Sequence, residues 1–292
     1  MGTGRSNSLL ACLALALALA PQAPFAQDGP QGPEAAALRE QRWHLPTDDG
    51  SGRSMRATVF RPAGETPRPL VVINHGSMIS GNATAPVPRF SAASRWFVEQ
   101  GYVVAVPQRR GYGATGGRWN ESYGHCENAD FKGAALEAAR DLAAAVAYMR
   151  RQPFVAPTGT LIVGQSAGGW ATLGYASQNP AGIPAMINFA GGRGGHRNNQ
   201  PNDNCSPANL VKAAGELGRT ARVPTLWVYT RNDSFFDPAL ATRMVEAWRA
   251  GGAPTDFQLL PPFGNDGHGL FASNKGPPAW TPLVRNHIAR HR

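Results

Sequence analysis

Apart from one run near its start, the sequence lacks any apolar stretch that approaches the roughly 20 residues needed to cross a membrane. That run extends from Leu9 to Ala20, behind the basic residue Arg5. A basic start, a short apolar run and a small residue at the cleavage site are typical of a secretory signal peptide. We therefore predict a signal peptide over residues 1–26, cleavage after Ala26, and a periplasmic or secreted protein with no stable membrane insertion.

Cysteine is scarce, with only three in 292 residues. Removal of the signal peptide takes away Cys12 and leaves one pair, Cys126 and Cys205. A pair of cysteines in an exported chain favours a disulfide because the compartment is oxidising. The sequence thus predicts an intramolecular disulfide between Cys126 and Cys205, which lie in segments rich in glycine and asparagine.

Acidic residues are fewer than basic ones, 19 against 28, which gives a formal net charge of +9. The basic residues are dispersed, with only short pairs such as Arg109-Arg110 and Arg150-Arg151. No basic arm with interleaved aromatic residues occurs, so nucleic-acid binding is not expected.

Short apolar runs alternate with helical patterns along most of the chain, without an internal repeat. The predicted buried strands are 69–76, 102–106, 159–163, 185–190, 224–229 and 256–260, after two short strands within 43–61, and the main predicted helices are 92–100, 129–151, 238–250 and 280–291. Such alternation predicts an α/β domain over 38–292, with a mainly parallel central sheet flanked by helices on both faces. Residues 27–37, rich in glycine, proline and glutamine, are predicted to form a flexible leader. Segment 191–222 interrupts the alternation after the sixth predicted strand, and we expect it to form a small cap or insertion over the functional site.

The most informative motif is Gly164-Gln165-Ser166-Ala167-Gly168. It follows the predicted strand over 159–163 and precedes a predicted helix. A Gly-x-Ser-x-Gly sequence between a strand and a helix is typical of a nucleophile elbow, a strained turn that presents the serine hydroxyl beyond the edge of the sheet. The glycines are required where neighbouring backbone comes too close for a Cβ atom. The sequence therefore predicts Ser166 as a catalytic nucleophile.

A serine hydroxyl becomes an effective nucleophile when a histidine accepts its proton. Only three histidines lie far enough downstream of Ser166: His268, His287 and His291. His268 occupies a glycine-flanked loop directly after the last predicted strand, whereas the other two lie on a basic C-terminal helix, where we expect them to be solvated. The sequence predicts His268 as the general base.

The histidine in turn needs an acid that fixes its tautomer and orientation. Asp233 follows the penultimate predicted strand and is the preferred candidate, because a side chain there can reach a histidine across the sheet edge. Asp237 precedes Pro238 and a helical pattern, so helix capping already explains it. Asp266 lies too close in sequence to His268 for the usual arrangement.

Acyl transfer also requires N–H donors for the developing oxyanion. We expect one from Ala167, at the start of the helix after the nucleophile, and one from Ser77, where Gly76 lets the chain turn after strand 69–76. No partner at ligand spacing accompanies His75, so no metal site is predicted there. The substrate is expected to contact His75, Gly76, Trp170 and Arg193.

At these residues the chain resembles the α/β-hydrolase superfamily. More narrowly, it resembles exported bacterial proteins labelled dienelactone hydrolase-like, which share features with prolyl-oligopeptidase-type catalytic domains. The stretches that carry the resemblance are 72–77, 107–113, 164–170, 189–194, 226–233 and 263–268. The resemblance implies an α/β-hydrolase fold and hydrolysis without a cofactor.

The chain departs from dienelactone hydrolases proper, which use a cysteine nucleophile, because its elbow carries Ser166. This departure favours ordinary esters of small molecules as substrates, cleaved through an acyl-enzyme with Ser166, His268 and Asp233. The alternative is a serine peptidase or amidase of the prolyl-oligopeptidase type, although we expect no amino-terminal propeller of that type before the first predicted strand. A third hypothesis is a non-catalytic binding protein that keeps the hydrolase fold.

Overall fold

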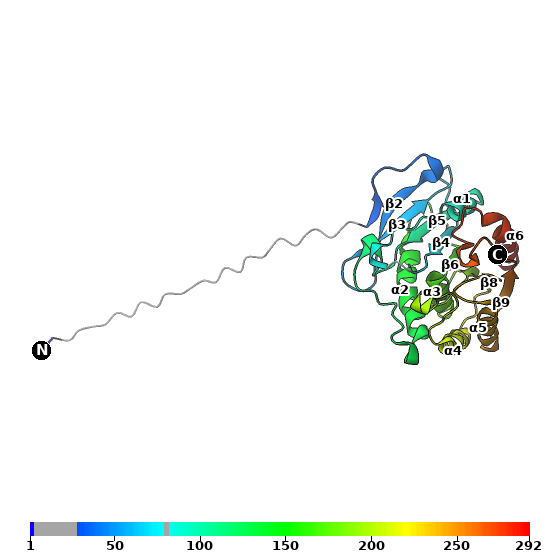
Figure 1. Cartoon of the computed structure of the whole chain (residues 1–292). Helices are drawn as coiled ribbons and strands as arrows, with labels where there is room; N and C mark the ends of the chain where they lie inside the picture. The colour runs from blue at the N-terminus through cyan, green and yellow to red at the C-terminus, as the bar shows by residue number, and fades with distance from the viewer. Residues whose placement is uncertain (3–27, 79–81) are drawn as a thin grey trace.

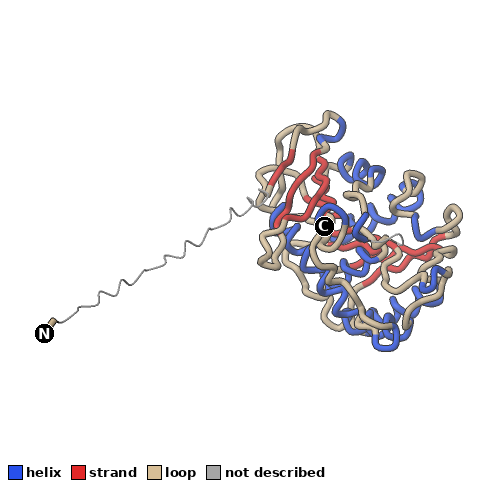
Figure 2. The backbone as a smooth tube through the Cα atoms, turned by 60° about the vertical axis from the view of Figure 1, so that its left-hand side comes forward, coloured by secondary structure: helices blue, strands red, loops and turns tan. Residues whose placement is uncertain are grey.

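The computed structural model describes residues 1–2, 28–78 and 82–292, which are organised around one large twisted sheet (Figures 1 and 2). Apart from residues 1–2, the predicted signal peptide and its cleavage site lie outside the described residues. Within the described ranges, no helix has the length and apolar character needed to cross a membrane.

The sheet joins an antiparallel part to a larger parallel part. Its strands are β1 (Gly29–Gln31), β2 (Gln41–Pro46), β3 (Ser54–Phe60), β4 (Leu70–Asn74), β5 (Val103–Pro107), β6 (Leu161–Gln165), β7 (Ala185–Phe189), β8 (Thr225–Thr230) and β9 (Thr255–Leu260). Their order is β1-β2-β3-β5-β4-β6-β7-β8-β9. The pairs from β1 to β5 along this order are antiparallel, and all pairs from β5 to β9 are parallel.

Helices cover both faces of the sheet (Figure 1). One apolar core contains side chains of α1 (Ser91–Glu99) and α6 (Pro277–His291), and the other contains side chains of α2 (Phe131–Met149), α3 (Ala167–Ala176), α4 (Pro207–Gly218) and α5 (Pro238–Ala250). Successive residues of β4 alternate between the two cores: Val71 and Ile73 lie in the first, Val72 in the second. Strands buried on both faces have to be apolar throughout, which is why β4 to β7 read as continuous apolar runs. The predicted architecture, a mainly parallel sheet with helices on both faces, is confirmed.

Single turns of 3₁₀ helix occur in the connections. They are η1 (Ala37–Arg39), η2 (Asn82–Thr84), η3 (Gly113–Thr115), η4 (Cys126–Asn128), η5 (Arg197–Asn199) and η6 (Gly267–Gly269). Residues 29–31, within the segment expected to be a flexible leader, form β1 and pair with β2. Because β1 was not predicted, segment 191–222 follows the seventh strand rather than the sixth.

Segment 191–222 has two parts with different roles in the fold. Its second part is α4, which packs against α5 and provides the crossover that the parallel strands β7 and β8 require. Only residues 191–206 are additional to the strand–helix alternation. These residues are attached to the loop before α2 by the predicted disulfide, which joins Cys126 to Cys205.

Candidate active site

Ser166 occupies a sharp turn between β6 and α3. Its backbone has φ 56° and ψ −125°, a conformation that a residue with a side chain rarely adopts. A Cβ atom on Gly164 would overlap the carbonyl oxygen of Gly168, and one on Gly168 would overlap the carbonyl oxygen of Asn74. The strand–turn–helix context and the need for both glycines are as the motif predicts.

His268 and Asp233 are brought together from the loops that follow β9 and β8. Nδ1 of His268 lies 3.0 Å from Oδ1 and 3.1 Å from Oδ2 of Asp233. The Asp233 carboxylate is buried and also accepts the backbone N–H groups of Phe235 (2.8 Å) and Phe236 (3.0 Å). These donors orient the carboxylate independently of the histidine.

The two other aspartates considered from the sequence have different partners. Asp237 caps α5 by accepting the N–H of Leu240 at 2.8 Å. Asp266 accepts the backbone N–H groups of His268 (2.9 Å) and Ser234 (3.0 Å), so it fixes the backbone of the histidine loop. Burial alone would raise the pKa of Asp266, but the hydrogen bonds from Ser234 and His268 outweigh it and hold this pKa below its usual value.

The elbow and the histidine loop are in direct contact. Nε2 of Gln165, the residue before Ser166, donates to the carbonyl oxygen of His268 at 3.0 Å. Ser166 and His268 are each 8% exposed. Among the residues that the structure describes, no hydrogen bond joins the Ser166 hydroxyl to the His268 ring, and such bonds are often long in unliganded enzymes and shorten with substrate.

The loop after β4 lies directly against the nucleophile. A Cβ atom on Gly76 would be 3.0 Å from Cβ of Ser166. Nδ2 of Asn74, at the end of β4, donates to the carbonyl oxygen of Gly168 at 3.2 Å and so ties this strand to the first turn of α3. The Ala167 amide is among the first N–H groups of α3, which have no partner within a helix. Gly76, which precedes Ser77, and Ala167 are therefore neighbours of Ser166 from two separate segments.

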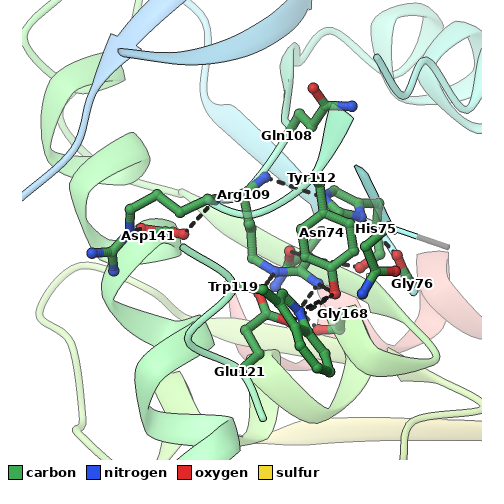
Figure 3. A network of polar contacts seen from close by, with 12 residues as sticks. Asn74, His75, Gly76, Gln108, Arg109, Tyr112, Trp119, Glu121, Asp141 and Gly168 are labelled. Carbon is green, nitrogen blue, oxygen red and sulfur yellow. Dashed lines mark hydrogen bonds and ion pairs between the residues drawn. The ribbon is translucent and has the colours of Figure 1, made fainter. Parts of the chain in front are cut away.

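A buried arginine holds the loop after β4 in place (Figure 3). The Arg109 guanidinium donates to Oδ1 of Asn74 and, at 2.6 Å, to the carbonyl oxygen of His75. It also forms an ion pair with Glu121, and the Tyr112 hydroxyl donates to the same carboxylate at 2.9 Å. Burial alone would raise the pKa of Glu121, but nearby arginine charges lower it to about 2. Glu121 is therefore ionised and anchors the loop through Arg109.

Sequence reasoning missed Arg109, Tyr112 and Glu121 as functional support. Arg109 and Tyr112 lie within stretch 107–113, which carries the family resemblance, but nothing in that stretch indicates which side chains are buried. Glu121 pairs with an arginine 12 residues earlier in the chain and with another, Arg193, 72 residues later. Only the folded chain brings these three segments together.

His75 was expected to contact substrate, but both of its ring nitrogens have partners within the protein. Nε2 accepts the Arg109 N–H at 3.1 Å, and Nδ1 lies 2.7 Å from the carbonyl oxygen of Gly76. Burial, reinforced by the Arg109 charge, lowers the pKa of His75 to about 3. His75 is thus a neutral, structural side chain that shapes the turn at Gly76.

Trp170 and Arg193 were also expected in the substrate site, but both side chains are buried and have partners within the protein. Trp170 is 0% exposed, and its indole N–H donates to the carbonyl oxygen of Phe131 at 2.8 Å. It packs in the core because α3 is buried on all sides. Arg193 is 4% exposed and pairs with Glu121, so its charge belongs to the buried network around Arg109.

His287 is buried too, contrary to the expectation of a solvated helix. Its Nδ1 lies 2.9 Å from Oδ2 of Asp256, and burial lowers the pKa of His287. Among the described residues, Asp256, His287 and His291 place ligand atoms within 4.8 Å of one another. Arg290 also donates to Asp256, at 2.6 Å, so the carboxylate charge is already neutralised. We interpret this group as the attachment of α6 to β9 and assign no metal to it.

Comparison with known proteins shows that the chain is similar to hydrolases. Residues 55–286 match the model of the dienelactone hydrolase family. Dipeptidyl-peptidase 5 of Porphyromonas gingivalis is 28% identical to the chain over 152 residues, which are 52% of this chain and 21% of that protein. The chain therefore spans about a fifth of the length of this curated relative.

Two solved structures illustrate the range of similar proteins. Acylaminoacyl peptidase of Pyrococcus horikoshii superposes with a TM-score of 0.61 and 14% identity, covering 86% of this chain and 41% of that chain. A cold-adapted esterase from an Arctic intertidal metagenomic library superposes with a TM-score of 0.60 and 15% identity, covering 90% of this chain and 100% of that chain. At these identities the likeness establishes the fold alone, which is the predicted α/β-hydrolase fold.

Proposed function

The chain belongs to the dienelactone hydrolase family, and on that premise we propose that it cleaves carboxylic esters as a serine hydrolase. The observation that carries the proposal is the conjunction of a strained Ser166 with the His268–Asp233 pair. The Gln165–His268 hydrogen bond links these two parts of the site. Each part comes from a different loop at the carboxyl edge of the parallel sheet, where ligands of open α/β sheets bind.

In the proposed reaction, Ser166 Oγ attacks the ester carbonyl while Nε2 of His268 accepts the hydroxyl proton. Nδ1–H of His268 donates to Asp233, which fixes the tautomer and stabilises the imidazolium. The amides of Ala167 and Ser77 stabilise the oxyanion of the tetrahedral intermediate. Its collapse breaks the ester C–O bond, and the proton passes from His268 to the departing alcohol. Water, activated by His268, then hydrolyses the acyl-enzyme, and this chemistry requires no cofactor.

The loop after β4 supports the proposed oxyanion site because its backbone is held rigidly. Arg109 bonds Asn74 and His75, and Asn74 bonds the first turn of α3. Donors that are already oriented need no reorganisation during the reaction, which is what makes such a site effective.

The exposure of apolar side chains indicates where we expect the substrate to bind. Apart from Met1, the exposed large apolar side chains among the described residues are Met78 (41%) and Trp119 (36%). They follow β4 and β5 at the same sheet edge as Ser166. We assign the apolar part of a small ester to this side, and Gly76 remains the substrate-facing residue expected from the sequence. The disulfide is compatible with an oxidising compartment, which supports the proposed export.

A peptidase is the second candidate, because the curated relative with 28% identity is a dipeptidyl-peptidase. The match covers only 21% of that relative, so its activity is not carried over to this chain and ester hydrolysis stays the first candidate. Amide cleavage uses the same three residues but demands stronger protonation of the leaving nitrogen.

The test is hydrolysis of p-nitrophenyl esters from acetate to decanoate, together with aminoacyl and dipeptidyl p-nitroanilides, by wild type and Ser166→Ala. We expect ester hydrolysis that falls by at least about 10³-fold in the variant. Hydrolysis of the anilides alone would replace the esterase with the peptidase. Wild-type activity that survives Ser166→Ala, or no activity on either class, would overturn the proposed mechanism.

A further inference from the structure

The Phe235 ring lies between two histidine rings. On one side it stacks on His268, with ring centroids 4.0 Å apart and an interplanar angle of 23°. On the other side it stacks on His196, at 3.9 Å and 22°. The three rings come from three segments: the loop after β8, the loop after β9, and residues 191–206. The Phe235 ring thus lies against one face of the His268 imidazole, which transfers the protons in the proposed mechanism.

Backbone contacts fix Phe235 in this position. Its N–H donates to Asp233, the same carboxylate that faces His268, and its carbonyl oxygen accepts Nδ2 of Asn204 at 2.6 Å. A Cβ atom on Gly195 would lie 3.0 Å from Cδ1 of Phe235, so the ring is closely packed from that direction as well. The ring is therefore held before any substrate binds.

The outer ring, His196, is tied to the same loops by hydrogen bonds. Its Nε2 lies 2.8 Å from the hydroxyl of Ser234, and that hydroxyl donates to Asp266 at 2.6 Å. Asp266 in turn accepts the backbone N–H of His268. The disulfide at Cys205 anchors the segment that carries His196 to the body of the protein.

We propose that Phe235 is the positioning residue for the His268 base and that His196 holds Phe235 against it, an inference that rests on the proposed function. The contact with Asp233 fixes one ring nitrogen but leaves the ring free to tilt about it. Stacking fixes the plane, and the plane sets where Nε2 points. The face of an aromatic ring also attracts a cation, so Phe235 favours the imidazolium that forms in each proton transfer.

The test compares Phe235→Leu and Phe235→Tyr, with Phe257→Leu as the matched control. Phe257 is a half-buried phenylalanine on β9 whose ring contacts Tyr229, and it pairs with no histidine ring within the part of the chain that the structure describes. We expect Phe235→Leu to lower kcat about 10–100-fold with KM little changed, since small misplacement of a reacting group has effects of this size. Phe235→Tyr should restore most of kcat, and Phe257→Leu should keep it. A kcat of Phe235→Leu within about twofold of wild type, or no recovery in Phe235→Tyr, would overturn the proposal.

His196 provides a second route that does not depend on the folding of the Phe235 variants. His196→Ala should lower kcat about 3–10-fold at unchanged KM, and His196→Phe, which keeps a ring over Phe235 but loses the bond to Ser234, should recover it. Equal kcat for wild type and His196→Ala would overturn the role of His196. Failure of the proposed function itself would appear differently, as activity that persists in Ser166→Ala.

Discussion

The buried pair of Arg109 and Glu121 offers a quantitative test of how the loop after β4 is held. Their side chains are 0% and 3% exposed. Glu121 also pairs with the buried Arg193, so removing Glu121 leaves two arginine charges without a carboxylate, whereas removing Arg109 leaves Glu121 with one arginine. Removing one partner of a buried pair costs about 3–5 kcal/mol, and we expect Glu121→Gln to lose at least that much free energy of unfolding and Arg109→Met to lose less. In the double variant neither charge of the pair remains, and Arg193 is the one charge of the network that stays. Its loss should therefore fall short of the sum by about 0.5–3 kcal/mol.

The assay is equilibrium unfolding in urea followed by circular dichroism, with ester hydrolysis measured on the same samples. Arg110→Met is the matched control, because Arg110 is the next residue and is 4% exposed, yet it pairs with Asp141 and Asp49. We expect both arginine variants to lose stability. Only Arg109→Met should lower kcat, by about 10–100-fold, because only Arg109 bonds Asn74 and His75 beside the nucleophile.

Two results would refute this reasoning. Losses of stability that add to within about 0.5 kcal/mol in the double variant would show that Arg109 and Glu121 are not coupled. Equal losses of kcat in Arg109→Met and Arg110→Met would show that the loop does not depend on Arg109 in particular.

Three further predictions concern the surrounding structure. His75 is neutral when folded, with a pKa of about 3, whereas an unfolded histidine binds a proton below about pH 6.5. The free energy of unfolding should therefore fall as pH decreases from 6.5 to 3, by about 1.4 kcal/mol per pH unit for this group, and His75→Gln should flatten that slope in urea titrations; equal slopes would contradict this. Gly168→Ala should lose about 1–3 kcal/mol of stability and most of its activity, because the added Cβ overlaps the Asn74 carbonyl; an unchanged melting temperature would speak against the close approach. Replacing Cys126 and Cys205 together by serine should cost about 2–5 kcal/mol in the same unfolding assay, since the bond closes a loop with a sequence separation of 79; wild-type stability would show that the bond contributes little.

The fold was predictable because its signals are local. Continuous apolar runs bounded by glycine and proline identified β4 to β8, and the helix predicted over 238–250 has the bounds of α5. The α/β-hydrolase fold and the disulfide were confirmed. By contrast, β1 was missed because a three-residue strand on the sheet edge has no periodicity to detect. The helix α4 was assigned to an insertion because a glycine- and asparagine-rich stretch precedes it.

The candidate site was predictable only in part. A strand-end position singled out Ser166, His268 and Asp233, with nearby glycines as a further signal for the first two. The structure places His268 and Asp233 in hydrogen-bonding contact. The burial of Trp170 and Arg193 could not be predicted, because residue type does not reveal which way a side chain points.

By itself, the sequence determined the order of strands and helices, the serine turn and the loops that carry the histidine and the aspartate, since each depends on neighbouring residues along the chain. The tertiary structure alone decided which charges are buried together and what supports the reacting groups. The Arg109–Glu121–Arg193 network and the stack of Phe235 between two histidines join segments far apart in the chain. Contacts of this kind leave no periodic trace in a sequence, because they depend on the distance between side chains after folding and not on their spacing before it.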